Sequence, residues 1–349
     1  MKKNVVILFG GCSSEYEVSL KSASAIISNM DSKKYHSILI GITRDGDWVR
    51  YYGDINRILT DSWYSHNNDC VPVMISPDRY AKKLIEFGIE CIKETTIDIV
   101  FPVLHGKNGE DGTIQGLVEM AGIPFVGCNT LSSALCMDKD RAHKLVELAG
   151  IKVPSSVVFS KSLTANEIIE QTNHLSFPVF VKPVKAGSSI GISKIYEMEE
   201  LPKAVSNAFL HDNQVIVEEN IEGFEVGCAI VGNDELIVGE VDEIELDHGF
   251  FDFKEKYNLK SSKIHMPARI DIETAKRIKE TATMIYRVLG CQGLARVDMF
   301  LTLKKEIVFN EVNTFPGFTT HSRFPNMMKG IGLEFGELVD KLIQLGIEK

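Results

Sequence analysis

The order of apolar and polar positions predicts alternating strands and helices in the first third of the chain. An apolar run over residues 4–9 ends at Gly10 and Gly11, as expected for a buried strand. Ser14 and Glu17 have the spacing of a capping box and predict a helix that ends near residue 30. Three more strands are predicted over residues 35–42, 70–76 and 97–104. Strands that alternate with helices favour a parallel sheet.

The same pattern predicts where the first domain ends and which elements form the second. Asp111 is expected to cap a helix that runs to residue 120 and closes at Gly122, so the first domain covers residues 1–123. A central domain is predicted over residues 124–213. Its elements are helices over 131–149, 164–173 and 199–209, and strands over 156–159 and 178–183.

From residue 214 the chain is rich in strands, and residues 214–349 are predicted to form a third domain. Asp271 is the expected cap of a helix over 272–289. The stretches ARVDMFLT and EIVFNEVNT predict two more strands, and a last helix follows Leu333.

Length, charge and cysteine content limit the class of protein. The 349 residues exceed one typical core, and the net charge of −10 disfavours nucleic acid as the main partner. Seven cysteines in no zinc-binding spacing favour reduced thiols in a cytosol. The apolar run near the N-terminus is too short for an export signal, and no stretch approaches the roughly 20 apolar residues of a membrane span. A cytoplasmic enzyme without a membrane partner is therefore expected.

Two neighbouring strands near the C-terminus carry oxygen ligands. ARVDMF contains Asp298, and FNEVN contains Glu311 and Asn313, which share a face because they lie two residues apart. In a hairpin the three side chains would converge. Two carboxylates about 4 Å apart repel by roughly 4 kcal/mol at an effective dielectric of about 20. A hard dication such as Mg²⁺ would offset this repulsion, and a solvent-facing polar edge is the alternative.

Two stretches have the chemistry of an anion or nucleotide site. VKPVKAGSSIG, residues 181–191, combines lysines with glycines whose N–H groups can approach an anion. It lacks the P-loop signature, and ordinary turns have similar compositions. In QVIVEENIEGFEVG, Glu218 and Glu225 follow an apolar run and could bind a base or a ribose. A solvated strand end is the alternative there.

Two loops are candidates for substrate contact and closure. HGKNGEDGTIQG, residues 105–116, follows an apolar strand, where α/β sheets bind ligands. His105 either contacts a substrate or is a structural histidine of the turn. GFFDFKEKY, residues 249–257, mixes aromatic and basic residues in a long connection. That composition predicts a lid over residues 247–262, and an anchored surface loop is the alternative.

Together these stretches resemble the ATP-grasp D-alanine–D-alanine ligases, including their vancomycin-resistance relatives, over nearly the whole chain. The shared motifs are GGCSSEYEVS (10–19), HGKNGEDGTIQG (105–116), MDKDR (137–141), VKPVKAGSSIG (181–191), EKY (255–257), RVD (296–298) and NEVNTFPGFTTHS (310–322). Seven motifs in one order are far more specific than any one of them. The resemblance implies an α/β, three-domain ATP-grasp fold with an N-terminal parallel sheet and ATP between the other two domains.

The resemblance also implies a reaction in two steps. ATP phosphorylates the carboxylate of a first D-alanine, and the amine of a second D-amino acid attacks the acyl phosphate to give a dipeptide for peptidoglycan precursors. Such a site must exclude water, because water hydrolyses the acyl phosphate. The implied cofactors are ATP and two Mg²⁺ ions, or Mn²⁺ in their place. The implied assembly is a homodimer.

The motifs imply roles for individual residues. Those that contact ATP are Lys139, Phe180, Lys182, Ser189, Glu218, Ile221, Glu225, Lys256, Phe300 and Asn310. Those that ligate magnesium are Asp298, Glu311 and Asn313. Those that act around the reacting groups are Glu15, Ser188, Tyr257, Arg296 and Gly317. Those that contact the substrates are Val18, His105, Asp242, Ser322 and Arg323.

Two departures within the family favour D-serine as the second substrate. The lid motif retains Tyr257, which the D-lactate ligases of the resistance branch lack, so an amide product is expected. Arg323 replaces the leucine of many housekeeping ligases, and residues 241–257 resemble the D-alanine–D-serine ligases of the VanG type. A serine hydroxyl needs a polar partner, which Asp242, Glu243 or Arg323 would supply. Glu219 also stands where several relatives carry lysine.

Three alternatives stay open. The first is a housekeeping D-alanine–D-alanine ligase. The second is another ATP-grasp carboxylate–amine ligase, which the set of Glu15, Ser188 and Tyr257 disfavours. The third is an inactive nucleotide-binding sensor, which would have lost a magnesium ligand or Arg296, and the chain retains all of them.

Overall fold

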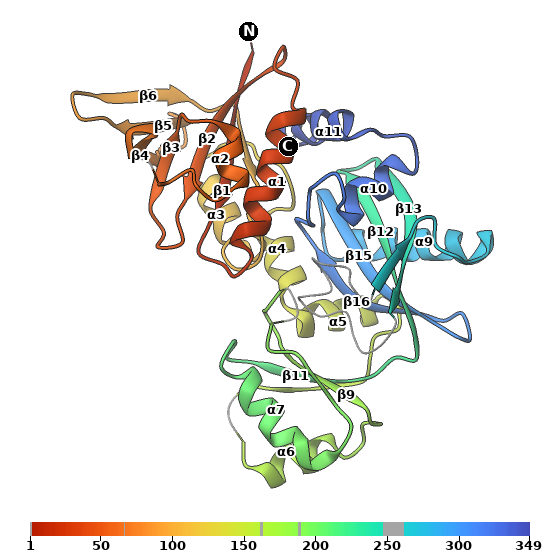
Figure 1. The fold of residues 1–349 in the computed structure, drawn as a ribbon. Coiled ribbons are helices and arrows are strands. Elements are labelled where there is room, and N and C mark those ends of the chain that lie inside the picture. The colour runs from red at the N-terminus through yellow and green to blue at the C-terminus, as the bar shows by residue number, and fades with distance from the viewer. Residues whose placement is uncertain (1, 66, 161–162, 188–189, 247–261) are drawn as a thin grey trace.

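Three sheets form the framework of the protein (Figure 1). The computed structural model describes residues 2–65, 67–160, 163–187, 190–246 and 262–349. Within these residues the sheets have seven, four and five strands and follow one another along the chain. The α/β class predicted from the sequence is therefore confirmed. None of the helices in the described ranges combines the length and the apolar character that crossing a lipid bilayer requires.

The N-terminal sheet contains the predicted parallel strands, but it is mixed, because further strands pair antiparallel. Its order is β6-β5-β4-β3-β2-β1-β7. Only β1, β2 and β7 pair in parallel, and β4, the strand predicted over 70–76, is antiparallel to its neighbours. Short turns, such as residues 43–47, return the chain antiparallel, whereas a parallel pair needs a long crossover. The strands are β1 (Lys3–Gly10), β2 (Tyr35–Ile42), β3 (Trp48–Tyr51), β4 (Cys70–Ile75), β5 (Lys83–Phe87), β6 (Ile92–Thr96) and β7 (Ile99–Pro102).

Helix α1 begins one residue later than a cap at Ser14 would place it. It spans Tyr16–Asn29, and its cap residue Glu15 makes no side-chain capping bond. The predicted capping box of Ser14 and Glu17 is therefore wrong. The hydroxyl of Ser13 instead accepts the Glu15 N–H and donates to the carbonyl of His105. The other helical segments here are α2 (Ile55–Leu59), a 3₁₀ turn (Asn67–Asp69) and α3 (Thr113–Met120), which begins after Gly112 rather than Asp111.

The predicted helix over 131–149 is two helices, α4 (Thr130–Met137) and α5 (Lys139–Leu148). Asp138 breaks them apart with extended backbone angles, φ −88° and ψ 97°, and its carboxylate accepts the Arg141 N–H at 3.1 Å. An aspartate that caps a new helix competes with continuation of the old one. The break sets the face of α5 that is buried, which carries Lys139, Ala142, His143 and Val146.

The central sheet has the order β10-β9-β11-β8 and is antiparallel throughout the described strands. The helices α6 and α7 lie beside this sheet (Figure 1), and their apolar side chains pack against it. The domain boundary predicted at residue 214 falls just before β11, which pairs within this sheet. Its elements are β8 (Ser156–Phe159), α6 (Ala165–Thr172), β9 (Val179–Pro183), β10 (Ser193–Ile195), a 3₁₀ turn (Met198–Glu200), α7 (Leu201–Ala208) and β11 (Val215–Glu219).

The C-terminal sheet has the order β14-β13-β12-β15-β16, with antiparallel pairs. Helix α9 (Ile272–Val288) packs on it, and Asp271 caps this helix as predicted, by accepting the Thr274 N–H. Helix α10 (Arg323–Lys329) packs against β12 and β13. The strands are β12 (Gly223–Gly232), β13 (Leu236–Leu246), β14 (Ser262–His265), β15 (Gly293–Thr302) and β16 (Ile307–Asn313).

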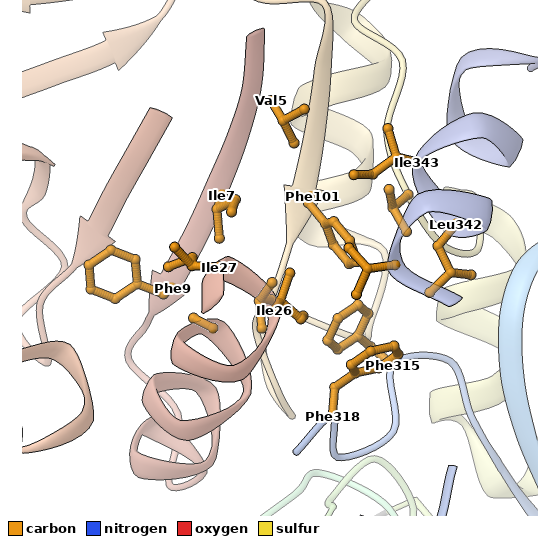
Figure 2. Close-up of a cluster of buried hydrophobic side chains, with 14 of the residues drawn as sticks. Val5, Ile7, Phe9, Ile26, Ile27, Phe101, Phe315, Phe318, Leu342 and Ile343 are labelled. Atoms are coloured by element: carbon orange, nitrogen blue, oxygen red, sulfur yellow. The ribbon is translucent and has the colours of Figure 1, made fainter. Parts of the chain in front are cut away.

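One core joins both ends of the chain. The last helix, α11 (Phe335–Ile347), packs beside α1, and its Leu342 and Ile343 lie with Ile7 of β1 in one buried cluster (Figure 2). Phe315 and Phe318 belong to the same cluster, with ring centroids 6.2 Å apart. The turn between β16 and α10 is therefore fixed by aromatic side chains on both sides of Gly317.

We expect Asp138→Ala to lower the apparent free energy of unfolding by about 1 kcal/mol, because it removes the N-cap of α5. Asp138→Asn keeps a cap oxygen and is the matched control. Urea unfolding followed by circular dichroism measures the difference. Equal stability of the two variants would contradict the assignment of Asp138 as the cap.

Candidate active site

Two adjoining cavities lie where the three sheets meet. The larger, about 560 Å³, lies between the central and C-terminal sheets, and the smaller, about 40 Å³, reaches the N-terminal domain. Lys139, Ala186 and Glu311 line both. Nine of the predicted nucleotide and metal residues line the larger one: Lys139, Phe180, Lys182, Glu218, Ile221, Glu225, Phe300, Asn310 and Glu311. The structure thus brings together residues that are up to 172 positions apart, Lys139 and Glu311.

The floor of the larger cavity is a buried ion pair on the central sheet. Lys182 of β9 and Glu218 of β11 come from adjacent strands, and the Lys182 Nζ lies 2.5 Å from Glu218 Oε2. Burial acts to raise the pKa of the Glu218 carboxyl, but attraction from Lys182 and then His143 outweighs it, so this pKa is lowered. A carboxylate fixed in this state is a hydrogen-bond acceptor for a ligand in the cavity.

Apolar side chains from two sheets form the walls of this cavity. Phe180 lies on β9, opposite Glu218 in the strand register, and Phe300 lies on β15. Ile221 follows β11 and lines the same space. A flat apolar slot with a fixed carboxylate at its edge has the properties that bind a nucleobase.

The predicted metal ligands lie side by side, as the hairpin requires. In the β15–β16 register, Asp298 stands opposite Glu311 and Arg296 stands opposite Asn313. Arg296 donates to both oxygens of Asp298, with its Nε 2.8 Å from Oδ1 and its Nη2 2.7 Å from Oδ2. Asn313 donates to Asp298 Oδ2 at 2.9 Å. Glu311 faces the Lys139 Nζ at 3.7 Å.

This donor set fits a hard cation that phosphate oxygens help to bind. Two carboxylates and an amide oxygen suit Mg²⁺, which takes few ligands from the protein in phosphate sites. Glu311 and Asn313 line the smaller cavity, whereas Asp298 is 2% exposed and is held by Arg296. In the described part of the chain, no group of three or more His, Cys, Asp or Glu side chains could hold a metal alone.

Arg323 and Asp242, predicted to contact the second substrate, bind each other. The Arg323 Nε lies 2.6 Å from Asp242 Oδ2 and its Nη2 lies 2.7 Å from Oδ1. Asp242 is fully buried and also accepts the Gly227 N–H. Arg323 further donates to Glu225 at 3.1 Å and lies 3.5 Å from Asp298. Burial acts to lower the pKa of Arg323, but attraction from Asp242 and then Asp298 raises it, so the guanidinium stays charged.

Glu15 lies at the smaller cavity, where loops from two domains approach it closely. A Cβ at Gly106 would lie 2.3 Å from Glu15 Oε2, and one at Gly187 would lie 2.9 Å from it. Gly106 also has a positive φ of 70°, which favours glycine. Val18 follows Glu15 by one turn of α1, at the half-buried edge of that helix. The glycines at 106 and 187 therefore leave room for this carboxylate.

His105 is buried, and both of its ring nitrogens have partners. Its Nδ1 lies 3.0 Å from the carbonyl of Phe315, and its Nε2 lies 3.0 Å from the hydroxyl of Ser22. Because a carbonyl only accepts, Nδ1 carries the hydrogen. Burial lowers the pKa of His105 to about 4. This geometry favours the structural alternative, and its contact with a substrate stays a prediction.

Ser322 and Gly317 lie in one turn. The Ser322 hydroxyl accepts the Thr319 N–H at 3.0 Å, and it lies 3.2 Å from where a Gly317 Cβ would be. The Phe318 N–H donates to Ser22 on α1 at 3.2 Å. Four of the predicted site residues lie outside the described residues, as does most of the predicted lid: Ser188, Ser189, Lys256 and Tyr257.

Two residues of the site were missed in the sequence. Glu110 accepts the Gly106 N–H at 2.8 Å and the Phe315 N–H at 3.1 Å, and so ties an N-terminal loop to the C-terminal turn. Burial and the nearby Glu15 raise its pKa to about 8. His143 lies beside Glu218, on the inner face of α5. Glu110 lies within the glycine-rich motif at residues 105–116, so the sequence could have indicated it. The burial of His143 could be recognised only once the structure showed that α5 begins after Asp138.

Comparison with known proteins agrees with this geometry. The model "D-ala D-ala ligase N-terminus" matches residues 4–128, and "D-ala D-ala ligase C-terminus" matches residues 145–344. A D-alanine–D-alanine ligase from Caldicellulosiruptor bescii is 45% identical over 100% of this chain and 96% of its own. Vancomycin B-type resistance protein VanB from Enterococcus faecalis is 44% identical over 100% of this chain and 99% of its own.

Solved structures agree as well. The VanG D-Ala:D-Ser ligase from Enterococcus faecalis is 58% identical, with a TM-score of 0.92 over 99% of this chain and 100% of that one. The D-alanine–D-alanine ligase from Coxiella burnetii is 30% identical, with a TM-score of 0.88 over 99% and 94% of the two chains. The three sheets and the cavity between the last two are those of an ATP-grasp ligase. Within that class, the chain belongs to the D-alanine–D-alanine ligase family.

The state of His105 predicts a dependence of stability on pH. Its folded pKa of about 4 lies below the ordinary 6.5, so the unfolded chain binds this proton more readily. Protonation of His105 in the unfolded chain should therefore lower the free energy of unfolding by about 3 kcal/mol as the pH drops from 6.5 to 4. Urea unfolding across this range should show a shallower fall for His105→Gln. His36→Gln removes an exposed histidine and should keep the wild-type slope.

Proposed function

We propose that this protein is an ATP-dependent ligase that joins D-alanine to a second D-amino acid, preferably D-serine, through a D-alanyl phosphate. The observation that carries the proposal is the pair of adjoining cavities that share Lys139 and Glu311. The larger cavity has apolar walls and the fixed carboxylate of Glu218, which suit a nucleotide. The smaller cavity has Glu15 at its edge. A phosphoryl group can pass between them without entering bulk water.

The larger cavity is proposed to hold ATP. Its base lies between Phe180 and Phe300, near Glu218 and Ile221, and Glu225 receives the ribose. Lys139 and Lys182 neutralise phosphate charge, and phosphoryl transfer depends mainly on such neutralisation and on positioning. Asp298, Glu311 and Asn313 would hold two Mg²⁺ ions, or Mn²⁺ ions, whose charge would draw the phosphates and the substrate carboxylate together.

The first step is proposed to begin at Glu15, which binds the ammonium of D-alanine. A carboxylate oxygen of that substrate attacks the γ-phosphorus, the bond to the bridging oxygen breaks, and ADP leaves. In the second step the neutral amine of the acceptor attacks the acyl carbon. The proton of the amine is lost and phosphate leaves with the electron pair of the broken bond. Arg296 and the Gly317 N–H stabilise the tetrahedral oxyanion between these events.

D-Serine is favoured by Arg323. A guanidinium has five N–H donors. Within the described residues, the guanidinium of Arg323 makes two hydrogen bonds to Asp242 and one to Glu225. Donor capacity therefore remains for a hydroxyl, while Asp242 fixes the orientation of the group. The 58% identity to the VanG D-Ala:D-Ser ligase supports the same acceptor. D-Alanine is the second candidate, because the relative from Caldicellulosiruptor bescii is named a D-alanine–D-alanine ligase.

A product assay with ATP, Mg²⁺ and D-alanine tests the acceptor directly. D-Serine, D-alanine and D-lactate are supplied in separate reactions at neutral pH. We expect kcat/KM for D-serine to exceed that for D-alanine by about tenfold, which corresponds to about 1.4 kcal/mol. A preference for D-alanine would overturn the serine assignment. ADP release that no D-amino acid stimulates would overturn the ligase itself and leave the sensor.

Arg323→Lys should lower kcat/KM for D-serine by about tenfold and change that for D-alanine less than threefold. Lysine keeps the positive charge beside Asp242 but loses the planar fork that orients the donors. Arg277→Lys, on α9 and away from both cavities, is the matched control. Equal losses for the two acceptors would show that Arg323 does not read the hydroxyl.

Glu311→Gln should lower the rate of ADP formation by about 100-fold or more and raise the Mg²⁺ concentration needed for half-maximal rate. The substitution removes one negative charge from the donor set at constant size. Glu306→Gln is the matched control, because Glu306 lies at the other end of the same hairpin, paired with Lys152. A variant with an unchanged Mg²⁺ requirement would remove Glu311 from the proposed ligands.

A further inference from the structure

Glu110 holds two loops that come from opposite ends of the chain. It lines the smaller cavity and stands shortly before α3. Its Oε2 accepts the Gly106 N–H at 2.8 Å, and its Oε1 accepts the Phe315 N–H at 3.1 Å. Each oxygen of this one carboxylate therefore fixes a backbone amide, one in the N-terminal domain and one in the turn that follows β16.

Phe315 is held at both of its backbone polar groups. Its N–H donates to Glu110, and its carbonyl accepts the Nδ1–H of His105 at 3.0 Å. Its ring packs in the core that α1 and α11 share (Figure 2). Two backbone hydrogen bonds and a buried ring together leave the φ and ψ angles of this residue little freedom.

A proline carries this constraint on to Gly317. Pro316 stands between Phe315 and Gly317. The proline ring fixes its own φ near about −65° and restricts the residue before it to extended conformations. Of the rotations between the Phe315 N–H and the Gly317 N–H, chiefly the ψ angle of Pro316 is left unrestricted. A displacement of Phe315 therefore displaces the N–H that is proposed to stabilise the oxyanion.

The other oxygen of Glu110 acts on the side of the first substrate. Gly106, whose N–H it accepts, lies against Glu15, because a Cβ at Gly106 would lie 2.3 Å from Glu15 Oε2. Glu110 thus fixes the loop beside the carboxylate that is proposed to bind the ammonium of D-alanine. One side chain sets the spacing between that ammonium site and the donor for the carbonyl oxygen of the same substrate.

We propose that Glu110 is a positioning residue for the second step, which holds the Gly317 N–H against the acyl oxygen of the substrate bound at Glu15. This inference rests on the proposed function and deepens it. The oxyanion forms only when the amine attacks the acyl carbon. A displaced N–H therefore slows that attack and leaves phosphoryl transfer in the first step nearly unchanged.

Glu110→Gln tests this division between the two steps on the full chain. Glutamine has the same size but only one acceptor oxygen, so it cannot bind both amides. The reaction contains Mg²⁺, saturating D-alanine and D-serine, and ATP that carries an isotopic label at its β,γ-bridging oxygen. First-step events are counted as label that moves to a non-bridging position of ATP, plus ADP released. Second-step events are counted as dipeptide formed.

We expect Glu110→Gln to raise the number of first-step events per dipeptide about tenfold over the wild type. The reason is that the D-alanyl phosphate waits longer for the amine. In that time it transfers its phosphoryl group back to ADP, or it leaves the site and water hydrolyses it to D-alanine and phosphate. A variant that is merely less stable loses both steps together and keeps the wild-type number.

Two further variants act on the same connection. Glu110→Asp keeps two acceptor oxygens on a shorter side chain and should raise the number less than Glu110→Gln does. Pro316→Ala leaves Glu110 in place but frees the backbone before Gly317, and should raise the number about threefold. It keeps the test decisive if Glu110→Gln does not fold. Asp111→Asn is the matched control, because Asp111 accepts two backbone N–H groups of its own loop and should leave the number unchanged.

The outcomes are distinct. A number that rises in Glu110→Gln or Pro316→Ala and keeps its wild-type value in Asp111→Asn supports the positioning role. If label exchange, ADP release and dipeptide formation fall in parallel in these variants, or do not change, Glu110 has only a structural role and the inference is wrong. A wild type that forms no dipeptide would overturn the proposed function and this inference with it, whereas an active wild type with unaffected variants overturns this inference alone.

Discussion

Repulsion between Asp298 and Glu311 is the constraint around which the charges of the site are arranged. The register of β15 and β16 places the two carboxylates opposite each other, and the fold cannot separate them without losing that pairing. Arg296 and Arg323 face one carboxylate and Lys139 faces the other. The cations come from β15, α10 and α5, so balancing one pair of acids draws three separate elements together. Electrostatic attraction and the packing of the domains therefore act in the same direction.

Aromatic packing gives the site its second fixed point. Phe315 and Phe318 enter the core that α1 and α11 share (Figure 2). Their neighbour Gly317 and the nearby Ser322 lie in the turn. His105 and Glu110 from the N-terminal domain bind the backbone of Phe315. Residues that stabilise charge can hold a precise geometry only when their backbone cannot move, and here a loop gains the rigidity of a core element.

Local sequence pattern predicted most elements, whereas strand direction and helix phase needed the tertiary structure. The strand over 35–42 and the Asp271 cap are set by their own side chains, and both predictions are confirmed. The antiparallel direction of β4 depends on connections that apolar runs do not encode. Most of the predicted site residues that the structure describes line the two cavities. They could be chosen from the sequence because their motifs are specific. The mutual pairing of Arg323 and Asp242, and the roles of Glu110 and His143, depend on contacts between distant segments.

The core shared by α1 and α11 has a consequence for biosynthesis. A ribosome releases the N-terminal sheet first, but Leu342 and Ile343, which cover part of its apolar surface, emerge only after the central and C-terminal sheets. Until then the nascent sheet exposes side chains such as Ile7 that the finished enzyme buries. Completion of the first domain must wait until α11 has emerged, and during that interval a chaperone has an apolar surface to shield.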